Sequence, residues 1–579
     1  MARRPTVSET IVAGLIHNGV TQVFGVVGDA LNSVTDAIRR TDGIDWIGTR
    51  HEEVAAFAAG AQAQLTGGLA ACAGTVGPGG IHLLNGLYDA AKSHAPVLAI
   101  AGQVPLADLG SDYFQEVDND RLFSDVAVFT QTITSPEQVP VVVDQAISAA
   151  LSRRGVAVLS LPGDVGAQPV GSDRPVRVFR DVTTVSPADE AVARAVETIN
   201  RAGRVTILAG IGAAGGRAET LALAEHLMAP MVVTIKGKEA FDWDNPFQVG
   251  QSGLLGNPAA AAALKDCDLL LMVGTDFPYR DWYPTSATVV QIDRRADHIG
   301  RRVPVDVSVT GDAALTVQSL LSKLHAKHDR GHLDKALRHH DRWRHRQSEL
   351  ADPEFDERVG GRARSVLDNP DARIRPEAVA GFINELADDD AIFTVDTGMS
   401  AVWLARFVQL RKGQRLLGSF NLGSMANAMP QAVGAQSRYR DRQVIAFCGD
   451  GGLTMLLGDL LTIARHRLPV KLVVFDNHRL GMVKLEQEQA GLPEFGTELD
   501  NPDLAAIAKA CGLAGVRITE PGDLGRKLTE ALSMPGPVLV DVLTNPDEVS
   551  VPPETTPGQA WGFAIAKVKE TLRSVGEGD

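Results

Sequence analysis

A glycine-rich turn, Gly449–Gly452, has residue types suited to holding a diphosphate and a metal ion. It directly follows an apolar run, Gln443–Cys448, that predicts a buried strand, and a helix is expected from Leu453. Glycines at a strand end let backbone N–H groups approach a phosphate, and a helix N-terminus favours its negative charge. Asp450 adds a carboxylate oxygen of the kind that Mg²⁺ prefers. For the tetrapeptide Gly449-Asp450-Gly451-Gly452 alone, an ordinary tight turn is the better interpretation.

A second predicted strand, Val470–Asp476, ends next to Asn477. The separation from Asp450 is 477 − 450 = 27 positions, which leaves room for a helix and a strand. Both residues can therefore sit at the ends of adjacent strands. Asn477 offers a neutral oxygen, and the loop after it, with His478 and Arg479, can offer a backbone carbonyl. This strand–turn–helix–strand–Asn arrangement is much more specific than the turn.

Glu52 is the leading candidate for acid–base work. A predicted strand, Asp45–Thr49, runs into an Ala-rich helix that starts at His51 and Glu52. This helix is largely apolar and is expected to be buried, which favours the neutral form of a carboxyl group. Alternatively, Glu52 and Glu53 merely complement the helix dipole. Successive helical residues point about 100° apart, so the two side chains cannot face one partner atom.

Other glycine-rich loops follow predicted strands. Gly25–Ala30 and Gly74–His82 lie in the N-terminal part, where each would by itself be an ordinary turn. Gly210–Gly215 fits a GxGxxG pattern after a strand. Because no acidic residue follows at the usual spacing on a second strand, classical NAD binding is disfavoured.

Short apolar runs alternate with Ala-rich helical patterns through most of the chain. This alternation predicts an α/β fold of doubly wound parallel sheets, with ligands at their carboxyl edges. A polar linker, Gln168–Ala188, and a charged segment, His325–Pro376, interrupt the pattern. The charged segment predicts an exposed helix and an irregular connection. A metal site is disfavoured there because its histidines lack ligand spacing. We therefore expect domains at 1–180, 185–335 and 370–550, and a tail at 551–579.

Composition excludes several classes of protein. The 579 residues carry a net charge of −15, so the basic footprint of a nucleic-acid-binding protein is missing. No apolar run is long enough for a membrane span, and the N-terminus lacks the features of a signal peptide. The expected location is the cytoplasm.

The turn and Asn477 resemble the diphosphate–Mg²⁺ motif of thiamine diphosphate enzymes. The resemblance implies Asp450, Asn477 and the Arg479 carbonyl as metal ligands, with Gly451 and Gly452 against the diphosphate. It also implies that Glu52 hydrogen-bonds N1′ of the aminopyrimidine. The loops that contain Gly28 and Gly77 would face the reactive end of the cofactor, and Met425 would wedge under it.

Longer runs resemble the pyruvate oxidase or pyruvate dehydrogenase (quinone) family, within the acetolactate synthase–pyruvate decarboxylase superfamily. They include TRHEEVAAFAAGAQAQLTG, TVGPGGIHLLNGLYDA and LLGSFNLGSMANAMPQA, and the resemblance covers about residues 5–565. It implies a pyrimidine-binding, a middle and a diphosphate-binding domain, with FAD in the middle. The flavin-binding positions would be Ser252, Gly253, Leu254, Leu255, Gly274, Thr275, Asp276, Phe277, Pro278 and Asp293. A middle domain without a cofactor, as in pyruvate decarboxylase, is the alternative.

The resemblance implies oxidative decarboxylation of pyruvate to acetate and CO₂, with electrons passing through FAD to a quinone. Phe114 and Gln115 would line the substrate pocket, and Glu486 would be an acidic active-site residue. Met482 stands where the family typically has Phe, in a loop that moves into the active site. For Phe114, Gln115 and Glu486, an ordinary packed or exposed side chain is the alternative.

Other activities stay open. An acetolactate-synthase-like carboligase would differ in its product, and an oxygen-dependent oxidase that forms acetyl phosphate would need phosphate. A non-catalytic protein with this fold is opposed by the presence of Glu52, Asp450 and Asn477.

The resemblance also implies partners. A homodimer is the minimum unit and a homotetramer is expected. The C-terminal tail has only a short apolar face, made by Phe563, Ile565, Val568 and Leu572. At most weak peripheral contact with the inner face of the cell membrane is therefore expected, or a different electron acceptor.

Overall fold

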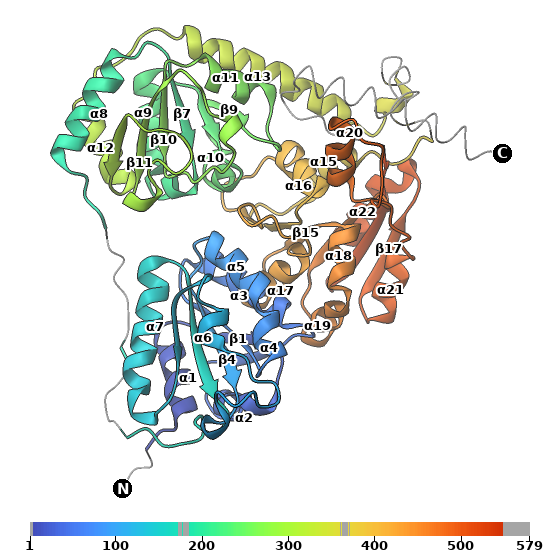
Figure 1. The fold of residues 1–579 in the computed structure, drawn as a ribbon. Coiled ribbons are helices and arrows are strands. Elements are labelled where there is room, and N and C mark those ends of the chain that lie inside the picture. Colours follow the sequence, from blue (N-terminus) through green and yellow to red (C-terminus); the bar gives the residue numbers. More distant parts are fainter. Residues whose placement is uncertain are drawn as a thin grey trace.

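The structure is a computed structural model that describes residues 4–547 apart from 172–175, 178–183, 359–360, 362–368 and 370. Over these residues the chain forms three six-stranded sheets, with all strands parallel and helices packed around them (Figure 1). The expected α/β fold class is confirmed. Each sheet lies within one of the blocks expected from the sequence, whose limits stay a prediction. The predicted tail, 551–579, lies outside the described residues.

The first sheet has the strand order β2-β1-β3-β4-β6-β5. Its strands are β1 Gln22–Gly25, β2 Asp45–Gly48, β3 Ala70–Gly74, β4 Val97–Gln103, β5 Ala127–Thr132 and β6 Val156–Pro162. Its helices are α1 Val7–His17, α2 Asn32–Arg39, α3 Glu52–Thr66, α4 Pro78–His82, α5 Leu84–Lys92, α6 Asn119–Leu122 and α7 Val139–Arg153.

The middle sheet has the order β12-β11-β10-β7-β8-β9. Its strands are β7 Val205–Ala209, β8 Met231–Val233, β9 Gln248–Gln251, β10 Leu269–Val273, β11 Thr288–Asp293 and β12 Val307–Thr310. The helices of this part are α8 Asp189–Arg201, α9 Arg217–Leu227, α10 Lys238–Phe241, α11 Pro258–Asp266, α12 Ala313–Leu321 and α13 Gly331–Leu350.

The third sheet has the order β14-β13-β15-β16-β18-β17. Its strands are β13 Ile392–Val395, β14 Arg415–Gly418, β15 Val444–Gly449, β16 Lys471–Asp476, β17 Ala514–Ile518 and β18 Val538–Leu543. Its helices are α15 Pro376–Leu386, α16 Met399–Phe407, α17 Ala428–Arg438, α18 Asp450–Met455, α19 Leu460–His466, α20 Gly481–Gln489, α21 Leu504–Ala510 and α22 Leu524–Leu532.

Each sheet reverses its winding direction at one point, and glycines gather there. The reversals fall between β1 and β3, between β7 and β10, and between β13 and β15. In open α/β sheets, ligands bind at such points, beyond the carboxyl ends of the strands. A Cβ on Gly28 would lie 2.3 Å from Thr75 Oγ1, and one on Gly210 would lie 2.3 Å from the Gly274 carbonyl oxygen. These glycines therefore let the two loops at a reversal approach each other.

The first and third sheets are joined by helices α3 and α17. Alanines of both helices belong to one apolar core, in which Ala58 faces α17. A Cβ on Gly434 would lie only 2.2 Å from the Ala58 carbonyl oxygen, so this contact requires glycine. Gln62 Nε2 also donates to the Gly434 carbonyl, at 3.2 Å. This joint fixes the first sheet relative to the third.

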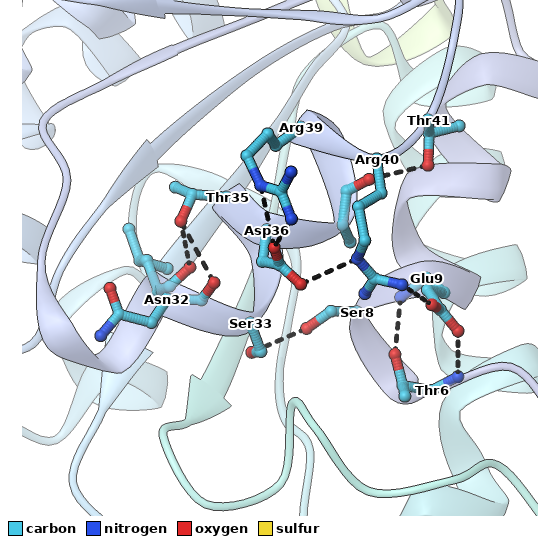
Figure 2. Close-up of polar contacts among 12 residues, drawn as sticks. Thr6, Ser8, Glu9, Asn32, Ser33, Thr35, Asp36, Arg39, Arg40 and Thr41 are labelled. Carbon is cyan, nitrogen blue, oxygen red and sulfur yellow. Dashed lines mark hydrogen bonds and ion pairs between the residues drawn. The ribbon is translucent and has the colours of Figure 1, made fainter.

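Polar contacts hold α1 against α2 beside the first sheet (Figure 2). Thr6 and Glu9 form a capping box, in which Glu9 N donates to Thr6 Oγ1 at 3.2 Å and Thr6 N donates to Glu9 Oε2 at 2.8 Å. The Arg40 guanidinium bridges Glu9 and Asp36, at 2.8 Å from each carboxylate. Arg40, at the end of α2, thereby ties this helix to Glu9 in the first turn of α1.

Helix α13 corrects one expectation from the sequence. The charged segment was predicted to be an exposed helix, but Leu333, Ala336 and His340 of α13 are buried. Leu333 and Ala336 recur at helical spacing, so α13 has one apolar face although its charged residues outnumber its apolar ones. Figure 1 shows α13 running from the middle sheet toward the helices of the third.

Among the described helices, none is long and apolar enough to cross a membrane.

Candidate functional site

The turn at Gly449–Gly452 joins β15 directly to α18 at the reversal point of the third sheet. A Cβ on Gly451 would lie 2.8 Å from Leu480 Cδ2, and one on Gly452 would lie 2.3 Å from Asp396 Oδ2. A Cβ on Gly449 would meet no atom within 4 Å. Larger residues would therefore not fit at the inner positions, while one side of the turn has free space. This arrangement suits close approach of a phosphate to the backbone.

Asp450 and Asn477 extend from neighbouring strands. Strand β15 pairs with β16, with Gly449 opposite Phe475, so the two polar residues follow matched strand ends. Asp450 is only 2% exposed, and its Oδ1 accepts a hydrogen bond from Gly451 N at 2.9 Å. Asn477 Oδ1 accepts one from Arg479 N at 3.1 Å. Carboxylate, amide and carbonyl oxygens at these positions have the chemistry of a Mg²⁺ site.

The Arg479 guanidinium has a separate role from its carbonyl. It forms ion pairs with Glu494 and Glu498, at 2.5 and 3.1 Å. Leu480 N also donates to the Thr497 carbonyl at 2.8 Å. These contacts hold the loop that follows β16 against the segment that follows α20.

Sequence reasoning missed the polar and charged contacts that surround Asp450. Asn501 Nδ2 donates to Asp450 Oδ2 at 2.7 Å and to Asp476 Oδ1 at 2.8 Å. Burial, together with the neighbouring Asp476 carboxylate, raises the pKa of Asp450. Burial and Asp476 likewise raise the pKa of Asp541. Clustered buried carboxylates repel one another, so a cation beside Asp450 would relieve the repulsion.

Met425 and Asp396 meet the same turn. A Cβ on Gly451 would lie 3.3 Å from Met425 Cε, which places Met425 beside the turn. Asp396 follows β13, and its Oδ1 accepts a hydrogen bond from Ala428 N at 2.9 Å. Burial raises the pKa of Asp396 to about 7. Sequence reasoning missed Asp396, although a carboxylate at the end of a predicted strand is a usable signal.

Glu52 is the first residue of α3 and is 7% exposed. Its Oε2 lies 3.0 Å from His82 Nδ1, and a Cβ on Gly79 would lie 3.3 Å from its Oε1. The His82 ring stacks on His51, with centroids 4.5 Å apart. His51 Nδ1 also accepts a hydrogen bond from Glu53 N and so caps α3. In the sequence His82 ends the glycine-rich segment Gly74–His82, but its contact with Glu52 was not expected. The turn after β3 and helix α4 bring it there.

The other predicted residues of the first sheet surround the same edge. A Cβ on Gly77, which has φ of 62°, would lie 2.7 Å from the Gln115 carbonyl oxygen. Gln115 itself has a positive φ of 66°, and its neighbour Phe114 is 79% exposed. Gly28 meets Thr75 in the loop that also contains Gly77. Gly28, Gly77 and Gln115 therefore lie on loops that meet at this edge, next to helix α4, which ends at His82.

The middle sheet borders a cavity of about 1060 Å³ at its carboxyl edge. Its lining includes Gly274, Thr275, Asp276, Pro278 and Asp293 from the predicted flavin-binding set. It also includes the cations Lys236, Arg294 and Arg295, which sequence reasoning missed. A large cavity with glycine-rich loops and several cations fits a dinucleotide.

A smaller cavity, of about 210 Å³, lies between the middle and third sheets. The predicted residues in its lining are Ser252, Leu254, Leu255, Asp276, Phe277, Pro278, Met482 and Glu486. Gly253 approaches this set, because a Cβ on it would lie 3.1 Å from the Phe277 ring. Asp276, Pro278 and Lys236 line both cavities, so the two adjoin. The fold thus brings predicted flavin-binding residues next to Met482 and Glu486, which are distant in sequence.

Asp276 joins all three parts of the molecule. Its Oδ2 lies 3.2 Å from Nε2 of His94, in the turn between α5 and β4, and accepts a hydrogen bond from Asn421 Nδ2 at 2.8 Å. Burial opposes ionisation of Asp276, but His94 and the nearby Lys236 outweigh it and hold its pKa well below the usual range. An ionised Asp276 therefore anchors the loop between the two cavities.

Glu52 and the turn at Gly449–Gly452 belong to different sheets. The hydrogen-bond partner of Glu52, His82, ends α4 beside the first sheet, whereas a Cβ on Gly451 would meet Leu480 and Met425 beside the third. Glu52 lines neither of the two cavities described above.

Known proteins match this chain over nearly its whole length. Residues 5–122, 192–320 and 396–542 match, respectively, the N-terminal TPP binding, central and C-terminal TPP binding domains of thiamine pyrophosphate enzymes. A putative thiamine pyrophosphate-containing protein, YdaP, from Bacillus subtilis (strain 168) is 38% identical over 95% of this chain and 93% of its own.

Two relatives have more specific names. A pyruvate oxidase from Lactiplantibacillus plantarum is 31% identical over 91% of this chain and 87% of its own. The acetolactate synthase large subunit of Parasynechococcus marenigrum is 32% identical over 96% of this chain and 90% of its own.

Proposed function

Because the chain belongs to the thiamine pyrophosphate enzyme family, we propose that it oxidatively decarboxylates pyruvate, with a quinone as electron acceptor. Pyruvate and water would give acetate, CO₂, two protons and two electrons. The electrons would pass to FAD and then reduce the quinone to its quinol. The named relatives include a pyruvate oxidase, but acetolactate synthases match about as well, so the site geometry carries this proposal.

The residues around Asp450 fit Mg²⁺ and a diphosphate. Asp450, Asn477 and the Arg479 carbonyl would hold the ion, and the glycines of the turn would approach the phosphates. Glu52 would donate a hydrogen bond to the aminopyrimidine, and Met425 would support the cofactor beside Gly451. When bound, thiamine diphosphate supplies the electron sink for decarboxylation and FAD accepts two electrons.

The smaller cavity is the observation that carries the redox assignment. It places Ser252, Phe277 and Pro278 of the proposed flavin site beside Met482 and Glu486 of the third sheet. The larger cavity, which adjoins it, has the volume and cations for the rest of the FAD molecule. Met482 packs partly against the core of the third sheet, while Glu486 is exposed and could order the substrate or water.

Phe114 and Gln115 would complete the pocket from a second copy of the chain. In our proposal the Glu52 edge of one protomer faces the Gly449–Gly452 turn of another, so a homodimer is the minimum unit. The large exposure of Phe114 supports this arrangement, because an aromatic ring that is 79% exposed is suited to an interface. A homotetramer, and at most weak peripheral membrane contact, complete the proposal.

An acetolactate-synthase-like carboligase is the second candidate, because relatives of that name match at similar identity. It would hold FAD in the same cavities without reducing it. An oxidase that uses oxygen and forms acetyl phosphate is distinguished by its need for phosphate.

The test is an anaerobic visible spectrum of the purified protein with Mg²⁺ and thiamine diphosphate, before and after pyruvate. We expect the oxidised flavin bands to bleach only when thiamine diphosphate is present, and to return on addition of a soluble quinone. CO₂ release with an oxidised flavin would instead identify a carboligase. Folded protein that binds no flavin would refute the assignment of the cavities.

A further inference from the structure

Asn501 lies between two buried carboxylates, and no sequence motif predicts this placement. It lies in the loop before α21, and its Nδ2 donates to Asp450 Oδ2 at 2.7 Å and to Asp476 Oδ1 at 2.8 Å. Asp450 is 2% exposed and Asp476 is fully buried. Both hydrogens of one amide group are thus committed to two carboxylates, of which one belongs to the proposed Mg²⁺ site.

The hydrogen bonds of Asp450 determine how its carboxylate is oriented. Gly451 N donates to Oδ1 at 2.9 Å, and Asn501 Nδ2 donates to Oδ2. With one donor on each oxygen, rotation of the carboxylate about its Cβ–Cγ bond would break one of the bonds. A lone pair on each oxygen stays available for a cation, since a carboxylate oxygen accepts more than one partner.

Asp476 holds Asn501 in turn. It ends β16, next to Asn477, so strand pairing fixes its position relative to β15. Its other neighbours are Asp541 on β18, whose pKa it raises, and His478, whose N donates to Asp476 Oδ1 at 3.3 Å. A hydrogen bond from an amide to a buried carboxylate is charge-assisted and stronger than one between neutral groups. Asp476 therefore orients the amide, and the amide orients Asp450.

We propose that Asn501, anchored by Asp476, is a positioning residue that holds the Asp450 carboxylate in the orientation that Mg²⁺ requires. The inference rests on the proposed function, because it takes Asp450 as a metal ligand. Groups that orient a metal ligand typically contribute 10- to 100-fold to metal affinity. Mg²⁺ demands a nearly ideal octahedral geometry, whereas Ca²⁺ tolerates irregular ones. Loss of the clamp should therefore weaken Mg²⁺ more than Ca²⁺.

The experiment titrates Mg²⁺, and separately Ca²⁺, into the full-length apoprotein with saturating thiamine diphosphate, followed by tryptophan fluorescence. We expect Asn501→Ala to raise the Kd for Mg²⁺ by about 10- to 100-fold and the Kd for Ca²⁺ by less. Asn501→Ser, which keeps one donor, should fall between. The control is Asn545→Ala, a buried asparagine that follows β18 and whose Oδ1 accepts from Asp547 N. It should leave both constants unchanged.

A double variant tests whether Asp476 acts through Asn501. Asp476→Asn alone should weaken Mg²⁺ binding, but adding it to Asn501→Ala should cause no more than about a twofold further loss. Fully additive losses would overturn the role of Asp476. Equal weakening of Mg²⁺ and Ca²⁺, or none, in both Asn501 variants would overturn the clamp. If Asp450→Ala also left Mg²⁺ binding unchanged, the proposed metal site itself would be wrong.

Discussion

At the scale of single residues, Glu52 shows how one contact changes the chemical interpretation. The sequence places this carboxyl at the start of a buried helix, which is compatible with helix capping or with catalysis. In the structure, His51 caps the helix through Glu53 N, so Glu52 is released from that role. Its Oε2 meets His82 instead, which leaves Oε1 near Gly79 for another partner. Because His51 caps the helix and Glu52 keeps one carboxylate oxygen available, the contacts favour a catalytic role for Glu52.

We expect Glu52→Gln to lower pyruvate-dependent flavin reduction by about 10²- to 10⁴-fold, the range typical of a lost acid–base group. The amide is similar in size but cannot exchange a proton with the aminopyrimidine. Stopped-flow absorbance of the flavin measures the rate directly, and the thermal unfolding midpoint should change little.

The neighbouring residue supplies the matched control. Glu53 accepts a hydrogen bond from Asn85 Nδ2 at 2.6 Å, whereas the His82 ring meets Glu52. Glu53→Gln should therefore keep most of the rate. Equal losses in both variants would mean that the charge of the helix start, and not Glu52 itself, is what matters.

At the scale of elements, α13 links the middle sheet to the third although its charged residues outnumber its apolar ones. Its buried side includes His340, which is 7% exposed and stacks on Trp343 with centroids 6.0 Å apart. Burial, aided by Arg344 and by Lys238 of α10, lowers the pKa of His340 to about 4. This histidine is therefore neutral in the folded protein at neutral pH.

The sign of the resulting pH dependence follows from linkage. Between about pH 6.5 and 4 the unfolded chain binds a proton at His340 that the folded chain does not, so stability falls as the pH falls. The contribution lost by pH 4.5 is about 2 kcal/mol. We expect His340→Gln to be less destabilised between pH 7 and 4.5 than the parent, as measured by urea unfolding. His345→Gln, on the exposed side of α13, should behave like the parent.

At the scale of the whole molecule, three sheets present glycine-lined reversal points, and Asp276 ties all three parts together. Its contacts with His94 and Asn421 set the loop between the two cavities. The α3–α17 joint separately fixes the first sheet against the third. These contacts arrange the edges within one chain, whereas the Glu52 edge and the Gly449–Gly452 turn would complete a site only across two chains in our proposal.

Mixing two inactive variants tests that arrangement. Glu52→Gln and Asp450→Ala would each be inactive alone. After subunit exchange at equal concentrations, half of the dimers would be mixed, and one of the two sites in each would be intact. About a quarter of the parent activity should therefore return. No recovery, despite exchange proved by differently tagged chains, would place the site within a single chain.

The sequence by itself predicted most of the architecture. Strand-like runs such as Gln443–Cys448 and Val470–Asp476 coincide with β15 and β16 to within a residue, because buried parallel strands are continuous apolar segments with clear ends. The same regularity placed Asp450 and Asn477 at strand ends. Local signals suffice where a residue's position follows directly from its own element.

Tertiary structure decided the contacts between elements. Asn501 reaches Asp450 across 51 positions, and His82 reaches Glu52 across 30, through loops whose local sequences give no sign of either partner. The buried face of α13 was missed because charged residues outnumber the apolar ones that pack. Met482 and Glu486 join the proposed flavin segment only because two sheets enclose a common cavity. Such contacts depend on how whole sheets pack, a long-range arrangement that no local pattern encodes.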